Sequence, residues 1–180
     1  MLLVLHKHYF SILLLCLSYT NMLYAGDLSL SESQLKAMYL FRYSSFIEWT
    51  TEALTTNTFK ICVFGENPFG KSLDLAVANE TVNGLPIEAL YINQQKNILG
   101  CHILFIAKSE SAELDSILTL IQHSPILTVS DIKDFIHLGG MIEFYIRDNK
   151  VRFFINPDLS KGVGLRIDAN LLRVGDIVTP

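Results

Sequence analysis

The chain has 180 residues, of which 50% are hydrophobic and 18% are charged. This composition predicts a folded domain with a sizeable core and excludes a disordered or low-complexity protein. The formal net charge is -4, and Lys and Arg do not occur in runs. A nucleic-acid partner is therefore not expected, because phosphate binding needs clustered basic residues.

The N-terminus has the layout of a secretory signal peptide. Lys7 precedes an apolar stretch at residues 9–17, which is shorter than the roughly 20 residues that a bilayer span needs. Small and polar residues follow, and cleavage is expected after Ala25. Residues 1–25 are interpreted as a signal peptide and residues 26–180 as the mature domain. An uncleaved signal-anchor helix is the alternative, and no lipid anchor is predicted because Leu15, which is not a small residue, precedes Cys16.

Residues 28–50 predict a long first helix. Its expected N-cap is Ser29, with Glu32 three residues later, and apolar residues then recur at helical spacing. A threonine-rich linker at residues 50–58 leads to a strand at 59–64 and a helix at 72–78. Asn83 and Gly84 predict a turn, and residues 86–92 predict a second strand.

The apolar run at residues 101–107 is typical of a buried parallel strand. A helix capped by Ser109 or Ser111 follows, then a short buried strand at residues 126–129 and a short helix that ends near His137. Two aromatic-rich, alternating runs at 141–147 and 151–156 flank residues 148–150, which predicts a β-hairpin. Residues 159–164 predict a turn or short helix, and residues 169–174 a terminal helix.

This order of elements predicts the fold class. Strands that alternate with helices indicate a single compact α/β domain, with a mostly parallel sheet flanked by helices on both faces. The C-terminal antiparallel hairpin is expected at one edge of this sheet. The sequence contains neither an internal repeat nor a linker to a second domain.

Two of the three cysteines, Cys62 and Cys101, belong to the mature domain. An even number of cysteines in an exported chain predicts a disulfide, and closing the loop between them would contribute about 4 kcal/mol. Two unpaired buried thiols are the alternative. His102 follows Cys101 on the same strand and should point to the opposite face, which argues against a metal site made from both.

Residues 65–72 match the phosphate-binding pattern G-x-x-x-x-G-K-[ST] between a strand and a helix. Such a loop needs successive backbone N–H groups directed at the phosphates. Pro68 lacks this donor, Glu66 adds a negative charge, and Phe69 is bulky. A nucleotide-binding enzyme that uses this loop is therefore the third hypothesis, and Lys71 and Ser72 are interpreted as incidental.

Polar and turn-forming residues follow two of the predicted strands at their carboxyl ends. Ligands bind at these ends in open α/β sheets, so both loops are candidate recognition loops. Their residues are Asn67, Pro68, Phe69, Gly70, Ser130 and Asp131. His123 and His137 are scattered relative to them, and nothing resembles a nucleophile elbow, so no catalytic, cofactor-binding or metal-binding residues are predicted.

Seven separated blocks of the chain, in the same order, resemble the YfiR/HmsC-like periplasmic proteins. The blocks are KAMYLF (36–41) with FIEW (46–49), ICV (61–63) with PFG (68–70), CHILFI (101–106), LTVSD (127–131), GGMI (139–142), VRF (151–153), and GLRI (164–167) with LL (171–172). Together they cover roughly residues 34–178, and their order makes the resemblance specific.

The resemblance implies a compact α/β domain of the Gram-negative periplasm that represses a membrane-bound diguanylate cyclase. Repression would act through contact with the periplasmic sensor region of that enzyme and would lower cyclic di-GMP and biofilm formation. Members tend to form homodimers and to carry disulfides tied to folding and redox sensing, and Cys62 and Cys101 stand at matching strand positions. The mature chain has no cysteines left for the second bridge that some members carry.

The leading hypothesis is thus a non-enzymatic periplasmic regulatory protein that acts by protein–protein contact. Its expected partner is the periplasmic region of an inner-membrane diguanylate cyclase, with a homodimer as a further expectation and no cofactor. A periplasmic small-ligand binding protein, which would use the two candidate recognition loops, is the alternative.

Overall fold

The computed structural model describes residues 30–51 and 54–179. The predicted signal peptide at residues 1–25 and the predicted cap Ser29 lie outside these residues. Within the described part, no helix is long and apolar enough to cross a membrane.

An eight-stranded sheet forms the centre of the domain, with the strand order β10-β8-β7-β6-β5-β2-β4-β3. Pairing is parallel from β4 through β2, β5 and β6 to β7, and between β8 and β10, but antiparallel at β7–β8 and β3–β4. The strands are β2 (Phe59–Phe64), β3 (Thr81–Val82), β4 (Leu85–Ile92), β5 (Ile103–Ile106), β6 (Leu127–Ser130), β7 (Ile142–Arg147), β8 (Lys150–Ile155) and β10 (Asp176–Ile177). The predicted fold class is confirmed.

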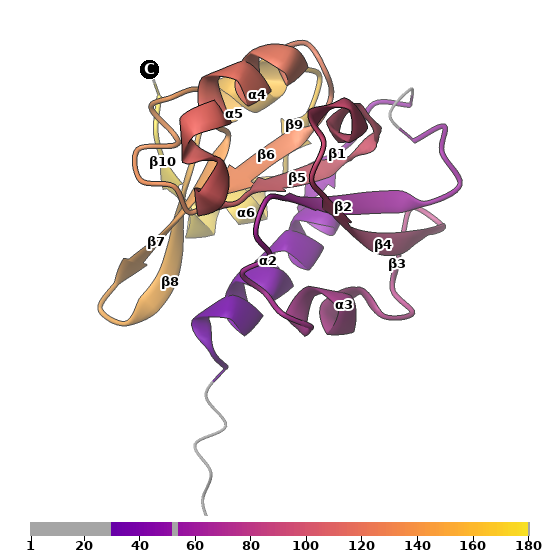
Figure 1. Ribbon diagram of the computed structural model, residues 1–180, viewed down its shortest axis with the longest axis horizontal. Helices are drawn as coiled ribbons and strands as arrows, with labels where there is room; N and C mark the ends of the chain where they lie inside the picture. The colour runs from indigo at the N-terminus through magenta and orange to yellow at the C-terminus, as the bar shows by residue number, and fades with distance from the viewer. Residues whose placement is uncertain (1–29, 52–53, 180) are drawn as a thin grey trace, which may run out of the picture.

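Helices cover both faces of this sheet, and Figure 1 shows α2 and α3 on one side and α4 on the other. One core lies under α2, α3 and α6, and a second, smaller core lies under α4 and η1. The helical elements are α2 (Glu32–Phe46), α3 (Ser72–Val77), η1 (Gln95–Gly100), η2 (Lys108–Glu113), α4 (Leu114–Ile121), α5 (Pro157–Gly162) and α6 (Ala169–Val174). A separate pair of two-residue strands, β1 (Ile47–Glu48) and β9 (Arg166–Ile167), joins the end of α2 to the C-terminal region.

The first helix begins two residues later than the predicted cap implies. Ser31, rather than Ser29, is the N-cap, and its side chain and that of Gln34 form a reciprocal capping box. Buried Ala37, Leu40 and Tyr43 recur at helical spacing and place one face of α2 on the sheet.

Two predicted features between β5 and β7 are wrong. Neither Ser109 nor Ser111 caps an α-helix, because both lie in the 3₁₀ segment η2 and α4 begins afterwards without a side-chain cap. Residues 132–139 form consecutive turns instead of a helix that ends near His137. Asp134 has a φ of +64°, which a right-handed helix does not allow, and the Glu143 carboxylate from β7 accepts hydrogen bonds from the backbone N–H groups of Asp134 and Ile136 and so stabilises the turns.

The predicted hairpin and turn are confirmed, but the sheet extends further than expected. Asp148 and Asn149 both have positive φ, as a two-residue hairpin turn requires, and Asn83 and Gly84 do the same between β3 and β4. The β7–β8 hairpin is not the edge of the sheet, because β10 adds a parallel strand beyond β8. The two-residue strands β3 and β10 were not predicted, because such short segments have no readable alternation.

Candidate functional site at the carboxyl edge of the sheet

The sheet has a topological switch point between β2 and β5. From β2 the chain passes through α3 to β4 on one side, and it later returns to β5 on the other side and continues into η2 and α4 on the opposite face. Loops that leave adjacent strands in opposite directions open a crevice at their carboxyl ends. A cleft of about 210 Å³ lies at this point, lined by Glu66, Asn67, Pro68, Ala107, Lys108, Ser109 and Asp131.

The loop after β2 is held by hydrogen bonds within the protein. The Asn67 side chain accepts from the Phe69 N–H at 2.9 Å and donates to the Gly70 carbonyl at 3.0 Å, so it closes a tight turn. Phe69 is buried against Phe105, with ring centroids 4.8 Å apart, and anchors the loop in the core. Of the predicted recognition residues in this loop, Asn67 and Pro68 line the cleft, whereas Phe69 supports it from below.

Further hydrogen bonds within the protein involve N–H groups of the phosphate-loop pattern. The Gly65 N–H donates to the Ile92 carbonyl, the Glu66 N–H donates to Ser109 Oγ, and the Ser72 N–H donates to the Phe69 carbonyl. Gly65 has a φ of +94°, and any Cβ there would collide with the side chains of Ser109 and Glu110. Four N–H groups of the loop, those of Gly65, Glu66, Phe69 and Ser72, are thus bonded within the protein, and Pro68 has none, so the loop lacks the series of free N–H groups that a phosphate cradle needs.

The second candidate loop follows β6 and contains a buried serine, Ser130, and a charged residue, Asp131. Ser130 is buried, where its hydroxyl donates to the Ile106 carbonyl at 2.7 Å and accepts from the Ile132 N–H at 3.0 Å. Asp131 lines the cleft and lies between two lysines, with Oδ2 2.7 Å from Lys36 Nζ and 3.5 Å from Lys108 Nζ. Ser130 thus positions the turn, and Asp131 is the residue that faces the cleft.

Lys36 is a buried cation that belongs to this site. Its side chain is 7% exposed, and its Nζ contacts Glu32 Oε1 at 2.5 Å as well as Asp131, whose side chain is 11% exposed. Burial by itself lowers the pKa of Lys36, but the hydrogen bonds and charges of Asp131 and Glu32 outweigh burial and raise that pKa. The ammonium group therefore stays charged and ties α2 to the end of β6.

The lining of the cleft combines charged, hydroxyl and apolar groups. Two carboxylates, from Glu66 and Asp131, and the ammonium group of Lys108 line a small polar space next to exposed Pro68. Ser109 is the hydroxyl in this lining, and its Oγ donates to Glu110 while accepting from the Glu66 N–H. Within the described residues, no three His, Cys, Asp or Glu side chains lie together so as to hold a metal ion.

Cys62 and Cys101 form a disulfide, as predicted, with Cα atoms 5.9 Å apart. The bridge joins the middle of β2 to the residue that follows η1, two positions before β5, and lies in the smaller core under η1 and α4. Both cysteines are buried. The bridge therefore locks together the two strands whose carboxyl ends open the cleft.

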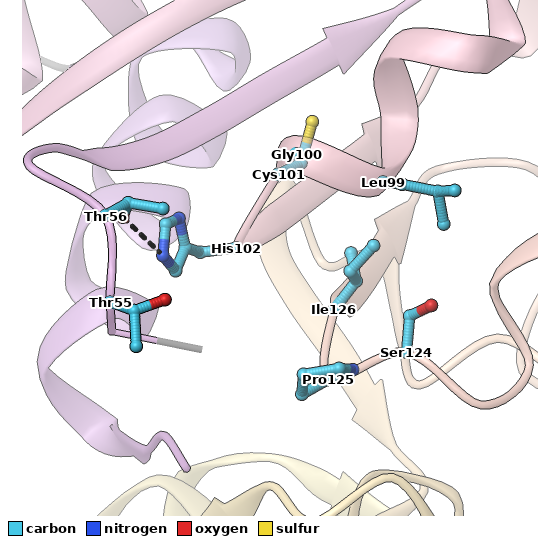
Figure 2. A pocket seen from close by; sticks show the side chains of 9 residues that line it. All are labelled: Thr55, Thr56, Leu99, Gly100, Cys101, His102, Ser124, Pro125 and Ile126. Atoms are coloured by element: carbon cyan, nitrogen blue, oxygen red, sulfur yellow. Dashed lines mark hydrogen bonds between the residues drawn. The ribbon is translucent and has the colours of Figure 1, made fainter. Parts of the chain in front are cut away.

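A second hollow lies at the opposite, amino edge of the sheet, with a volume of about 390 Å³ (Figure 2). His102 is its most polar residue, and the predicted opposite orientation of His102 and Cys101 is confirmed, since each packs in a different core. His102 Nδ1 accepts from the Lys60 N–H at 3.0 Å, Nε2 lies 3.4 Å from Thr56 Oγ1, and the ring stacks on Phe59. Because both ring nitrogens already have partners, we interpret His102 as a structural residue at this edge of the sheet.

Sequence reasoning placed the two loops correctly on the strands but missed the cations between them. Lys36 lies 95 residues before Asp131 in the chain, and Lys108 follows β5. The spacing of Glu32 and Lys36 indicates an i,i+4 pair on a helix, yet nothing in the sequence indicates that the lysine is buried. Only the packing of α2 across the sheet brings Lys36 to the cleft.

The domain has the same fold as solved structures of distant sequence. It matches a conserved domain protein from Vibrio cholerae O1 biovar eltor str. N16961, with a TM-score of 0.53 and 9% identity over 84% of this chain and 61% of that one. It also matches an ABC domain in complex with L-Trp from Streptococcus pneumonia, with a TM-score of 0.52 and 12% identity over 79% of this chain and 60% of that one. The chain thus spans about three fifths of the length of these structures, and the similarity concerns the fold alone.

No curated protein matches the chain significantly. A sequence profile of the YfiR/HmsC-like family, by contrast, matches residues 33–176, which include the sheet apart from Ile177 of β10, the disulfide and every residue that lines the cleft. The match covers most of the chain and agrees with the blocks that carry the resemblance in sequence. The chain belongs to the YfiR/HmsC-like family.

Proposed function

We propose that this protein is a periplasmic regulator that represses a membrane-bound diguanylate cyclase by binding its periplasmic sensor region. Repression would lower cyclic di-GMP and biofilm formation. The observation that carries the proposal is membership of the YfiR/HmsC-like family over residues 33–176. The cleft supports a binding role, because Asp131 and Lys108, two of its charged residues, are engaged in ion pairs.

Two features support the proposed periplasmic location. The first is the predicted signal peptide at residues 1–25, and the second is the Cys62–Cys101 disulfide, which forms and persists in oxidising compartments such as the bacterial periplasm. A homodimer is part of the proposal as an expectation from the family and has no residue assigned to it.

The mechanism is a shift between two states of the partner. A bound repressor lowers cyclase output only if it binds the inactive state of the sensor region more tightly than the active state. To reverse a 1:99 ratio of inactive to active cyclase, this preference must reach roughly 10⁴-fold. Exposed Asn67 and Pro68 are the proposed contact residues at the cleft. Asp131 also lines the cleft and is paired with Lys36.

Deletion of the gene followed by measurement of intracellular cyclic di-GMP tests this function. The nucleotide is expected to rise on deletion and to fall again when the full chain is supplied. A chain that lacks residues 1–25 and stays in the cytoplasm should not restore repression. An unchanged cyclic di-GMP level after deletion contradicts the proposal.

A periplasmic small-ligand binding protein is the second candidate, and the position of the cleft at the topological switch point favours it. Thermal unfolding in the presence of amino acids and other small polar metabolites is the test. A rise in Tm that is absent in Asp131→Asn but present in Lys71→Ala would support this alternative. Lys71→Ala is the matched control because Lys71 does not line the cleft and is part of the phosphate-loop pattern only.

A further inference from the structure

Both edge strands of the sheet are only two residues long and leave part of the neighbouring strand unpaired; β10 pairs with β8 only at Phe154 and Ile155. On one edge, β10 is only two residues long, and an Arg147–Asp176 ion pair crosses from β7 to it. On the other edge, β3 pairs with β4 only at Thr81↔Pro86 and Val82↔Leu85, although β4 continues to Ile92. The second half of β4 therefore has an open edge among the described residues.

The hydrogen bonds of β4 show which of its backbone N–H and C=O groups point away from β2. The Ile87 N–H donates outward to the Glu80 carbonyl at 3.0 Å, whereas the Ile92 carbonyl points inward and accepts from the Gly65 N–H. Because successive residues of a strand point their N–H and C=O groups to opposite sides, Ala89 and Tyr91 point theirs outward, like Ile87. Within residues 30–51 and 54–179, no backbone group pairs with these outward groups.

The side chains that flank this edge are apolar and partly exposed. Tyr91 is 43% exposed and donates to Asp74 at 3.0 Å, which fixes its ring beside α3, and Leu75 on the same helix is 74% exposed. On the other face of the sheet, Leu90 and Ile92 are half-buried and complete the smaller core. Figure 1 shows β4 at the margin of the sheet, with α3 below it. Soluble proteins usually protect such an edge, since it accepts a further strand.

We infer that the outer edge of β4 from Ala89 to Ile92 binds an extended segment of the membrane partner, which adds to the sheet as a further strand. This inference rests on the proposed function and assigns it a contact surface. The unpaired N–H and C=O groups of Ala89 and Tyr91 require an extended backbone as their complement, and alternate apolar side chains of the segment would contact Tyr91 and Leu75.

The charged side chains around this edge favour a segment of another protein over a second copy of this chain. The exposed acids around the edge are Asp74, Glu80 and Glu88. A second copy would bring the same acids to the edge from the other side, whereas a segment that carries Lys or Arg beside its apolar residues complements them. The partner segment is therefore expected to be basic and apolar in alternation.

The open edge and the cleft lie at the same carboxyl end of the sheet but on different strands. The Ile92 carbonyl points inward and accepts from the Gly65 N–H at the end of β2, directly before Glu66, Asn67 and Pro68 of the cleft lining. A segment paired with the outer edge of β4 would therefore have to cross the ends of β4 and β2 to reach the cleft.

Amide hydrogen exchange of the full mature chain provides the first test. The probe is the purified periplasmic region of the diguanylate cyclase whose output rises when the gene is deleted. In the complex, the Ala89 and Tyr91 amides should exchange at least about tenfold more slowly, since each gains a strand hydrogen bond. The inward Leu90 amide is the internal control and should not change.

Ala89→Pro provides the second test. Proline removes the outward N–H and keeps the bonds to β2, because edge strands tolerate proline where the N–H faces solvent. The affinity of the Ala89→Pro variant for the cyclase region should fall at least about tenfold, because the hydrogen bond from the residue 89 N–H is lost and a carbonyl of the partner stays unpaired. Ile177→Pro is the matched control on β10: the next residue, Val178, donates inward to Ile155, so the Ile177 N–H also faces outward.

The outcomes separate this inference from the proposed function. Binding that persists with unprotected Ala89 and Tyr91 amides, or with unchanged affinity in Ala89→Pro, overturns the strand-addition surface and leaves repression standing. Protection that rises with protein concentration without the cyclase region identifies a second copy as the occupant and overturns the inference. Absence of binding by the unsubstituted protein, together with unchanged cyclic di-GMP after deletion, overturns both.

Discussion

The Cys62–Cys101 disulfide should supply a large part of the stability of this domain. The two cysteines are 39 positions apart, so the bridge removes the closure entropy of a loop of this length from the unfolded chain. The chain-entropy relation gives about 4 kcal/mol at room temperature for such a loop. A domain of this size has a free energy of unfolding of roughly 5–15 kcal/mol, so reduction should remove a quarter or more of it.

Urea unfolding measures this loss directly. The fluorescence of Trp49 is a suitable probe, because Trp49 is the only tryptophan and packs on Phe59 of β2, with ring centroids 5.0 Å apart. With a urea dependence of about 2 kcal/mol/M, a loss of about 4 kcal/mol lowers the unfolding midpoint by about 2 M. The double variant Cys62→Ala/Cys101→Ala should show a loss of stability at least as large as that of the reduced protein.

The reduced, unsubstituted protein is the sharper comparison, because it keeps both sulfur atoms in the core and differs only in the cross-link. The alanine variant also loses two buried sulfur atoms and should be slightly less stable still. If reduction shifts the midpoint by less than about 0.5 M while mass spectrometry confirms that the bridge was intact, the loop-entropy argument is wrong for this protein.

Three further predictions rest on polar groups. Tyr43 is fully buried and its hydroxyl has no hydrogen-bond partner among the described residues, so Tyr43→Phe should raise the free energy of unfolding by about 1–2 kcal/mol, and a lower urea midpoint would contradict this. Asp131→Asn leaves buried Lys36 with one acidic partner and should cost about 2–3 kcal/mol in the same assay, with Lys36→Met/Asp131→Leu recovering much of the loss. Burial, with a further contribution from Asp74, raises the pKa of Tyr91 to about 12. The stability that Tyr91 contributes is therefore fully present below about pH 10 and is lost as the pH rises from there to about 12. Spectrophotometric titration should show one phenolate forming near pH 12 that is missing in Tyr91→Phe, and a titration unchanged by this substitution would refute the assignment.

Local patterns in the sequence were sufficient wherever neighbouring residues alone decide the structure. The apolar runs of β2, β5 and β6 were readable as buried parallel strands, because both of their faces are covered. Asp148 and Asn149 tolerate positive φ, so the hairpin turn was readable as well. Cysteine counting identified the bridge, since only two cysteines follow the predicted signal peptide.

Contacts between distant segments escaped the same reasoning. The segment that ends near His137 was predicted as a short helix, but the Glu143 side chain from β7 accepts from the N–H groups of Asp134 and Ile136 and stabilises turns instead. Pro68, Glu66 and Phe69 already argued against a phosphate loop, but the sequence did not indicate that Ile92 and Ser109 bond the N–H groups of Gly65 and Glu66. Each competing acceptor lies on another strand or loop, so its arrival depends on the fold rather than on local preference.

The sequence by itself determined the class of the domain and the bridge between its central strands, because periodicity, turn residues and cysteine number act locally or by count, and its ordered blocks carried the resemblance to the family. Tertiary structure alone decided which loops meet at the switch point, that Lys36 is buried against Asp131, and that β3 stops short and leaves Ala89 and Tyr91 unpaired. These features arise from strand order, and strand order is set by the packing of the whole sheet against its helices.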